Sequence, residues 1–524
     1  MAIIKSRKHV KTEGRGASPK RKEEKRRSST SSFDYAAPPE SSEPIELTVE
    51  RLADDGRGIA SDQGKTVFIE GALVGETVLT TITKRSNKYS EGRVKALLAS
   101  SPERITPPCP IFSRCGGCSV QYMAANKQLE FKQASVLSQL SRWADVQPEQ
   151  LLPAITGPEY GYRQRVRLAV EYTKDAQLYF GFREVNSRRI VSVDQCAVLE
   201  PPLQSLLLPL KTWLLSVKPK VVSHIELLNS VAGPSVVIRH ERKLGLDERV
   251  QLAQLLCLSI DGKSTEPPPL WFQGEKGAVL ENIKGEAVDP RLQYSVHADQ
   301  ALALSFHPQD FIQSNRVVNQ SMVTQAVEWL APQADEHIVD LFCGIGNFSL
   351  PLAQRAKWVT GVEGVNAMVA RARDNAVSNQ VDNITFVKKD LLDADLSVKS
   401  ITNVKGVQGK LTVDGLLLDP PRSGAKAICH HIRKLLPQRI VYVSCDSSSF
   451  ARDTKLLIDQ GYSLSRLGVM DMFPQTAHIE LMALFTLSHP QKAPSAKLSA
   501  KQGAKSATGK SGNKRNAKLT LKLG

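Results

Sequence analysis

The sequence lacks the segments that mark membrane and secreted proteins. No apolar run approaches the roughly 20 residues of a membrane-spanning helix. The basic N-terminus has no apolar stretch of the kind that a secretory signal requires. Eight cysteines among 524 residues are too few for a disulfide framework. We therefore expect a cytoplasmic protein, not bound to a membrane, with about three domains and additional tails.

Acidic residues are missing from residues 491–524, which carry nine Lys and Arg and a net charge of +9. Residues 1–30 carry eleven basic and three acidic residues, a net charge of +8. Because the whole chain has a net charge of +16, the remainder is nearly neutral at −1. We expect residues 1–43 and 489–524 to be disordered basic tails that contact nucleic acid. A solvated, solubilising tail would have the same composition.

The residue pattern between the tails indicates three folded regions. Residues 44–103 contain short alternating segments separated by glycine turns, which favour a small β-barrel. Residues 104–310 are mixed α/β and include an amphipathic helix near 121–143, which we expect to pack on the C-terminal domain. Residues 311–488 alternate strands with helices, which predicts a doubly wound α/β sheet. Its strands are expected at 338–342, 358–363, 384–389, 415–419 and 439–444, with helices at 366–379, 425–436 and 449–459.

A glycine loop follows the first of these strands. The segment Asp340–Gly346 allows a tight turn close to a ligand, but Ser349 replaces the third glycine of a dinucleotide fingerprint. The next two strands end in acids: Glu363 can accept both hydroxyls of a ribose, and Asp390 can meet an adenine amino group. Any one acid alone would be interpreted as a strand-end cap. Together they favour S-adenosylmethionine, which has no pyrophosphate to place on a helix N-terminus.

Reactive groups follow the fourth and fifth strands. The fourth ends in Asp419-Pro-Pro-Arg, a turn made rigid by its prolines. Most buried cysteines are inert apolar side chains, but Cys445 directly follows the fifth strand, at the edge where ligands bind. A thiolate beside a methyl donor suits covalent catalysis on a pyrimidine, because addition at C6 of uracil makes an enolate that can attack the methyl group. Glu480 is the candidate base for the C5 proton; the alternative is a surface charge on a strand.

Four cysteines form a further candidate site. Cys109, Cys115 and Cys118 fall within ten residues, and Cys196 lies far downstream. Four thiolates suit a [4Fe–4S] cluster or a structural zinc ion, and the spacing alone leaves both open. The isolated position of the fourth cysteine favours an iron–sulfur cluster, because zinc sites usually contain two CxxC-like pairs.

The motifs of the C-terminal region resemble those of the RNA uracil-5-methyltransferases. They are FIQSN (311–315), DLFCGIGNFSLPLA (340–353), GVEGV (361–365), DPPRSGA (419–425), VYVSCD (441–446) and DMFPQTAHIELMALF (471–485). Within that family the chain is similar to the members that methylate one uridine of 23S ribosomal RNA. Residues 45–100 resemble a TRAM domain, an OB-like RNA-binding module. One departure is Asp446-Ser447, where the family usually has Asn-Pro after its catalytic cysteine.

The resemblance implies a role for each candidate residue. Cys445 would be the nucleophile and Glu480 the base. Contacts with S-adenosylmethionine or the target base would come from Gln313, Phe342, Asn347, Glu363, Asp390 and Asp419. A [4Fe–4S] cluster with a structural, RNA-positioning role would be held by Cys109, Cys115, Cys118 and Cys196. The partner would be 23S ribosomal RNA, and we expect a monomer.

Competing interpretations are weighed by the same features. A transfer-RNA uracil-5-methyltransferase usually lacks both the barrel and the four cysteines, and a second ribosomal-RNA enzyme of the family typically lacks the barrel. A non-catalytic assembly factor would not need Cys445 and Glu480. A small-molecule methyltransferase would not need a barrel and basic tails. The segment GYRQRVR (161–167) fits an RNA-facing strand and an ordinary half-buried strand equally well.

Overall fold

The structure is a computed structural model that describes residues 43–217, 221–257, 266–274, 279–297, 302–391 and 412–488. Apart from Glu43, the predicted basic tails lie outside these residues. No helix in the described part of the chain is long and apolar enough to cross a membrane.

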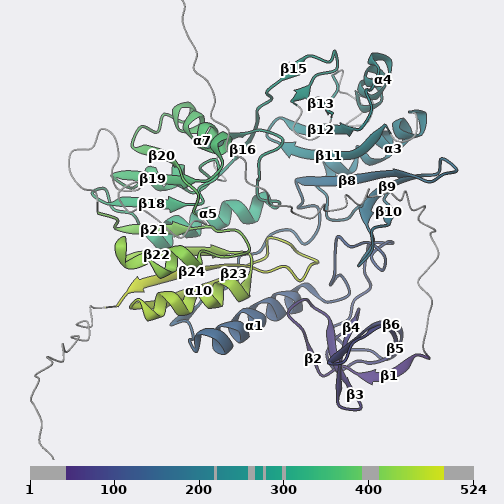
Figure 1. Cartoon of the computed structure of the whole chain (residues 1–524), viewed down its shortest axis with the longest axis horizontal. Coiled ribbons are helices and arrows are strands. Elements are labelled where there is room, and N and C mark those ends of the chain that lie inside the picture. The colour runs from purple at the N-terminus through teal and green to yellow at the C-terminus, as the bar shows by residue number, and fades with distance from the viewer. Residues whose placement is uncertain are drawn as a thin grey trace, which may run out of the picture. The chain divides into compact units, whose positions relative to one another are not determined.

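The first region is a six-stranded sheet with the strand order β1-β5-β6-β4-β3-β2 (Figure 1). Strands β1 and β2 are separated by only two residues, yet they form the two edges, so the sheet must curl until its edges approach each other. Its core is apolar and includes Val67, Ile69 and Val78. The strands are β1 Ile45–Thr48, β2 Arg51–Leu52, β3 Gly58–Asp62, β4 Lys65–Glu70, β5 Thr77–Arg85 and β6 Tyr89–Ala99.

Helix α1 (Ala125–Ala144) follows this sheet and ends at Asp145, which adopts the left-handed conformation that stops many helices. The helix packs on α10 (Ser447–Asp459) and β23 (Tyr462–Met470) of the C-terminal region. Its buried face mixes apolar residues such as Val136 and Leu140 with polar ones such as Gln128 and Lys132.

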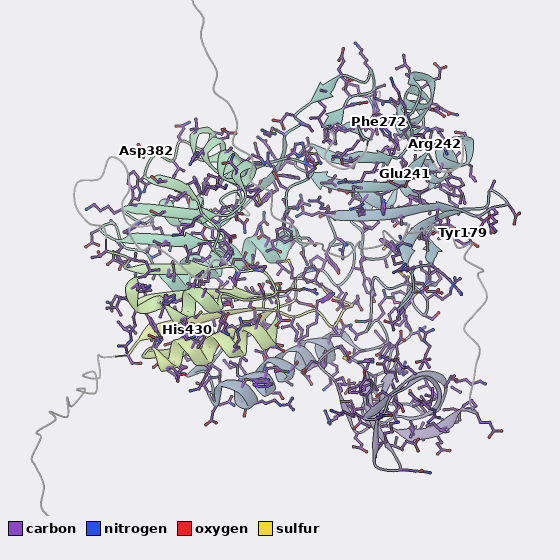
Figure 2. All side chains as sticks on the ribbon, in the orientation of Figure 1. Tyr179, Glu241, Arg242, Phe272, Asp382 and His430 are labelled. Carbon is purple, nitrogen blue, oxygen red and sulfur yellow. The ribbon has the colours of Figure 1, made fainter. Side chains whose placement is uncertain are left out.

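The central region is an eight-stranded sheet, ordered β10-β9-β8-β11-β12-β13-β14-β15. Helices α3 and α4 contribute to the apolar core beside it; Phe272 of β13, labelled in Figure 2, is fully buried there, and Arg249 of α4 lies over its ring. The strands are β8 Arg165–Tyr172, β9 Leu178–Arg183, β10 Ile190–Ser192, β11 Val222–Ser230, β12 Gly233–His240, β13 Leu270–Gln273, β14 Leu280–Glu281 and β15 Ala287–Val288. The helices are α2 Pro201–Gln204, α3 Leu207–Ser216 and α4 Leu246–Cys257.

A hairpin of β16 (Leu292–Ser295) and β17 (Ala303–Phe306) leads into the C-terminal region. That region is an eight-stranded sheet ordered β20-β19-β18-β21-β22-β24-β23-β7. Figure 1 labels these strands from β20 to β23. Strands β18 to β22 are parallel, whereas β24 is antiparallel to both β22 and β23. The strands are β7 Gln150–Leu151, β18 His337–Leu341, β19 Trp358–Glu363, β20 Ile384–Lys388, β21 Gly415–Leu418, β22 Arg439–Ser444, β23 Tyr462–Met470 and β24 Glu480–Leu487.

Helices cover both faces of this sheet, because alternate residues of a strand point to opposite sides. Val339 and Leu341 of β18 pack in one core with α1, α9 and α10, whereas Ile338 belongs to the core that contains α5, α6 and α7. The predicted helix 425–436 is divided into α9 and the short helix η1. The helices are α5 Arg316–Leu330, α6 Ser349–Ala353, α7 Asn366–Ser378, α9 Lys426–His430, η1 Ile432–Lys434 and α10 Ser447–Asp459.

The strand order reverses between β18 and β21, which lie side by side in the sheet but far apart in sequence. In open α/β sheets, ligands bind outside the carboxyl ends of the strands at such a reversal. The loops after β18 and β21 therefore mark the expected site.

Candidate active site

A cavity of about 610 Å³ lies at the carboxyl ends of the parallel strands. It is lined by Phe311, Gln313, Phe342, Gly344, Glu363, Gly364, Met368, Asp390, Leu391, Asp419, Pro420, Pro421, Arg422, Cys445, Phe473 and Glu480. We call it the cofactor cavity. Five of the six residues predicted to contact the cofactor or target base line it, and so do both predicted catalytic residues.

Asn347 is the predicted residue that does not line the cofactor cavity. Its side-chain oxygen accepts hydrogen bonds from the Tyr294 hydroxyl at 3.0 Å and the Asn319 amide at 3.2 Å, and its own amide donates to Asn319 Oδ1 at 3.0 Å. These contacts join the glycine loop to β16 and α5. Asn347 thus anchors the glycine loop to β16 and α5, and its predicted contact with a ligand stays a prediction.

The loop after β18 has an unusual backbone. Phe342 has a φ of +66° and Gly346 one of +99°, in the left-handed region where side chains are rarely tolerated. A Cβ at Gly346 would lie 2.5 Å from the Leu350 side chain. Glu363 braces this loop from β19, because one carboxylate oxygen accepts from the Gly344 amide at 3.2 Å and the other from the Val365 amide at 2.8 Å.

Two aspartates of the site are strongly affected by burial. Asp340 does not line the cavity; it is fully buried, accepts a short hydrogen bond from Ser349, and burial raises its pKa to about 8. Burial also raises the pKa of Asp419, which does line the cavity, to about 7. Charge in this part of the cavity is therefore costly unless a ligand compensates it.

Cys445 and Glu480 share the cofactor cavity. Cys445 directly follows β22, and burial, with smaller contributions from Glu480 and Asp419, raises the pKa of its thiol to about 11. Glu480 is the first residue of β24 and is 4% exposed; burial first, then Asp419, raises its pKa well above the usual range. In the free protein the Cys445 thiol is therefore protonated near neutral pH.

Asp446 stabilises the turn at which the family usually has Asn-Pro. Its side chain accepts from the Ser449 amide at 2.7 Å and so caps the N-terminus of α10, while Ser447 is the first residue of that helix. Aspartate is among the best N-cap residues, so the strand-to-helix turn after Cys445 is stabilised locally.

Several lining residues were not singled out from the sequence. Arg422 donates to the His478 ring at 3.3 Å and favours ionisation of both Cys445 and Glu480. Phe311, Met368 and Phe473 supply apolar walls. The signal for most of them was present, because they lie within or beside the quoted motifs, but their side chains carry no chemistry that spacing alone would reveal.

The four clustered cysteines line a second cavity, of about 470 Å³, which we call the cysteine cavity. Arg422, Cys445 and Phe473 line both cavities. All four thiols are free, and burial raises the pKa of Cys118 to about 12 and that of Cys196 to about 11. Among the described residues, no group of three or more His, Cys, Asp or Glu is placed so that it could hold a metal ion.

The segment GYRQRVR lies along β8 and its approach. Val166 and Leu168 face the apolar core of the central sheet. The Arg165 guanidinium donates to the carbonyls of Pro308 and Asp310, whereas Arg167 is half exposed and lines the cysteine cavity. Arg165 is therefore structural, whereas the side chain of Arg167 is available to a ligand.

The fold and site define a class of methyltransferase, and comparisons with known proteins agree. Residues 270–487 match the family model described as tRNA (Uracil-5-)-methyltransferase, and residues 43–95 match the TRAM domain. The crystal structure of the Pyrococcus abyssi tRNA (uracil-54, C5)-methyltransferase with S-adenosyl-L-homocysteine has a TM-score of 0.62 and 23% identity, and covers 84% of this chain and 100% of that one. That likeness shows a methyltransferase fold, here with an N-terminal TRAM domain.

The relatives narrow the class further. The 23S rRNA (uracil(1939)-C(5))-methyltransferase RlmD of Pseudomonas putida is 45% identical over 84% of this chain and 93% of its own length. That of Pseudomonas aeruginosa is 42% identical, with the same coverage. The chain belongs to this RlmD family of RNA methyltransferases.

Proposed function

We propose that this chain transfers a methyl group from S-adenosylmethionine to C5 of one uridine in 23S ribosomal RNA, the position numbered 1939 in the names of its relatives. The observation that carries the proposal is the shared cavity. Cys445 and Glu480 line it together with the acids Glu363, the last residue of β19, and Asp390, which follows β20. A nucleophile, a base and a site for a methyl donor are thus in one place.

The residues of the cofactor cavity fit S-adenosylmethionine. Each carboxylate oxygen of Glu363 accepts one backbone amide and retains a lone pair for a ribose hydroxyl. Asp390 and Gln313 add polar groups, and Phe311 and Met368 add apolar ones. When bound, this cofactor supplies an electrophilic methyl group that is transferred to C5 and leaves behind a neutral thioether.

Cys445 supplies the nucleophile. Its sulfur forms a bond to C6 of the uracil, and the electron pair of the C5=C6 bond moves toward O4 as an enolate, which makes C5 nucleophilic. The thiol must first give up its proton to water, which its pKa of about 11 opposes. Among the described residues, Arg422 is the cation whose charge favours the thiolate.

Glu480 completes the reaction. Once C5 carries the methyl group, the Glu480 carboxylate takes the C5 proton. The electron pair of the C5–H bond re-forms C5=C6, and the bond between sulfur and C6 breaks to return the thiolate. A buried carboxylate with a raised pKa suits this step, because it binds a proton more tightly than an exposed one.

The test is methyl transfer from labelled S-adenosylmethionine to unmodified 23S ribosomal RNA, followed by mapping of the labelled nucleotide. Cys445→Ala should bind RNA and cofactor but transfer nothing, and Cys257→Ala, which removes a half-buried thiol of α4, should behave like the parent. RNA containing 5-fluorouridine should become trapped on Cys445. Transfer by Cys445→Ala at the parental rate, or label found in transfer RNA instead, would contradict the proposal.

We also infer that Cys109, Cys115, Cys118 and Cys196 hold a [4Fe–4S] cluster. Support comes from four free thiols that line one cavity, because four cysteine thiolates are the usual ligands of such a cluster. Its role would be structural and would position the RNA. Iron and sulfide content and the brown absorbance should be lost in Cys196→Ala and kept in Cys257→Ala. A Cys196→Ala protein that kept both its colour and full methylation would overturn this assignment.

The remaining proposals concern organisation. We place the domain boundaries at 44–103, 104–310 and 311–488, with basic tails on either side. We also propose that the protein is a monomer. A ribosomal RNA substrate supports a cytoplasmic protein. Light scattering of the purified protein would test the monomer, with a dimer mass as the contradicting result.

A further inference from the structure

Helix α1 buries an unusual row of polar side chains. Gln128, Lys132, Ser135 and Gln139 are all at most 6% exposed, and their spacing places them on one face of the helix. A helix that only had to pack would place apolar residues there, because a buried polar group is costly unless it is hydrogen-bonded. Each of the four side chains has such a polar partner.

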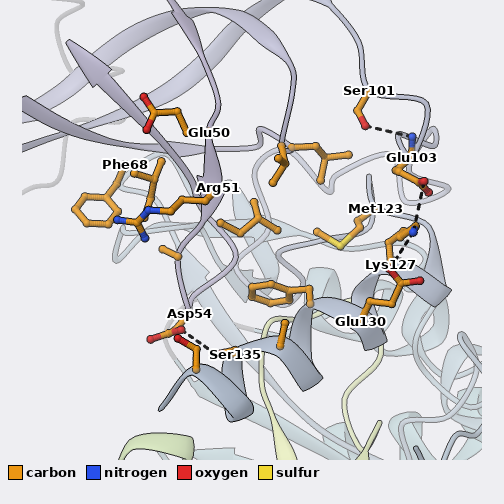
Figure 3. Close-up of a pocket in the computed structure, with 18 of the residues that line it drawn as sticks. Glu50, Arg51, Asp54, Phe68, Ser101, Glu103, Met123, Lys127, Glu130 and Ser135 are labelled. Carbon is orange, nitrogen blue, oxygen red and sulfur yellow. Dashed lines mark hydrogen bonds and ion pairs between the residues drawn. The ribbon is translucent and has the colours of Figure 1, made fainter. Parts of the chain in front are cut away.

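The four side chains bind two different targets. Ser135 and Gln139 both donate to the carboxylate of Asp54, in the loop after β2; Figure 3 shows the bond from Ser135. Gln128 and Lys132 instead reach residues 471–479, the loop that joins β23 to β24 and ends directly before Glu480. We call this segment the base loop.

Gln128 binds the base loop through both the nitrogen and the oxygen of its side-chain amide. Its nitrogen donates to Gln475 Oε1 at 3.0 Å, and its oxygen accepts from the Gln475 backbone amide at 2.9 Å. Gln475 is 1% exposed and has a φ of +68°, a conformation that a residue with a side chain keeps only when its surroundings impose it. Its carbonyl accepts from the amides of Ser119 and Val120 at 3.0 and 3.2 Å.

Lys132 holds the beginning of the same loop. Its ammonium is fully buried and lies 2.7 Å from Asp471 Oδ1 and 3.1 Å from the Phe473 carbonyl. Phe473 lines both the cofactor cavity and the cysteine cavity. Lys132 therefore fixes the backbone at the point where the base loop enters the site.

Glu480 itself has no comparable anchor. Within the described residues, no hydrogen bond or ion pair to its carboxylate is found, so its place is set by its backbone at the start of β24 and by the loop that precedes it. The proton that it removes must lie within hydrogen-bond reach, and a shift of about 1 Å can cost roughly 100-fold in rate.

We propose that Gln128 and Lys132 are positioning residues that hold the base loop so that Glu480 reaches the C5 proton. The proposal rests on the proposed function and specifies one step of it. A loosened base loop should slow proton removal and release of the RNA more than the formation of the bond between sulfur and C6. The variants should therefore accumulate RNA that is already methylated and still joined to Cys445.

The experiment uses the full chain, 23S ribosomal RNA and S-adenosylmethionine labelled in its methyl group. Gln128→Ala and Lys132→Met should lower kcat about tenfold to 100-fold, with little change in the KM for RNA, and should give a labelled protein–RNA adduct on a denaturing gel. Ser135→Ala is the matched control on the same face of α1, because its side chain binds Asp54 and not the base loop. It should form no more adduct than the parent.

A paired variant separates positioning from stability. Lys132→Met leaves the buried Asp471 carboxylate without its ion-pair partner, whereas Lys132→Met combined with Asp471→Asn does not. The pair should unfold closer to the parental temperature and still accumulate adduct, because the bond to the Phe473 carbonyl stays lost. Recovery of both stability and turnover in the pair would overturn the proposal, as would a lower kcat without adduct. A parent that forms no methylated RNA at all would instead refute the proposed function.

Discussion

The cofactor cavity and the cysteine cavity have three lining residues in common, but the rest of their residues come from different kinds of structural element. The cofactor cavity takes residues from the ends of five neighbouring parallel strands. The cysteine cavity takes most of its residues from irregular segments, namely 109–121, 195–198 and the base loop, and only a few from β8 and β9. A sheet places its ligand residues by topology, whereas irregular segments must be fixed by individual hydrogen bonds. Changes in the two cavities should therefore affect different steps and different substrates.

The largest effect is expected at Glu480, in the cofactor cavity. Glu480→Gln keeps the size of the side chain but cannot accept the C5 proton, so turnover should fall by roughly 100-fold to 10,000-fold. Methylated RNA should remain joined to Cys445, measured as labelled adduct on a denaturing gel. Equal loss of turnover without adduct would place Glu480 before the methyl transfer and not after it.

The reactivity of Cys445 should depend steeply on pH in the ligand-free protein. Because its pKa is raised to about 11, the thiolate fraction should grow about tenfold for each pH unit below that value. Alkylation of Cys445, followed by mass spectrometry of its peptide, should thus be about 100-fold faster near pH 9 than near pH 7. A rate that levels off near neutral pH would mean that Arg422 stabilises the thiolate more strongly than burial opposes it.

The contrast between strand ends and irregular segments also decides which site residues can be predicted from the sequence. The positions of the five parallel strands β18 to β22 could be predicted to within one residue, because parallel strands buried on both faces form continuous apolar segments. Since their carboxyl ends meet at one edge, Glu363, Asp390, Asp419 and Cys445 could be assigned to one site. Asn347 lies in the same motif, yet its side chain turns toward Tyr294, which no periodicity reveals.

Contacts between segments that lie far apart in the chain could not be predicted from the sequence. The bond between Gln128 and Gln475 joins residues 347 positions apart, and Arg422 meets His478 from another loop. Helix α1 was predicted from its amphipathic pattern, but its buried polar row departs from that pattern and marks the functional contacts. Where a pattern fails locally, as at Lys132, the structure supplies the partner that explains it.

A substitution confined to the cofactor cavity should affect the cofactor alone. Glu363→Gln removes the charge but keeps the size of the side chain that braces Gly344 and Val365. The KM for S-adenosylmethionine should rise about tenfold, because hydrogen bonds to a charged acceptor are stronger than neutral ones, and the KM for RNA should stay unchanged. Glu328→Gln, on the exposed side of α5, is the control and should change neither value.

The smallest effect is expected at the rim of the cysteine cavity, where the RNA and not the cofactor should be sensitive. Arg167 is 52% exposed on its side chain and its contact with Glu226 is long, at 3.8 Å, so its charge is available to a phosphate. Arg167→Ala should raise the KM for RNA about threefold and reduce the salt dependence of RNA binding by about one phosphate contact, measured by titration at several salt concentrations. Lys174→Ala removes one exposed charge from the turn between β8 and β9, away from the cavity, and should leave the salt dependence unchanged. If both variants lowered the salt dependence equally, the central sheet would attract RNA only through its net charge, and the cysteine cavity would have no defined RNA contact.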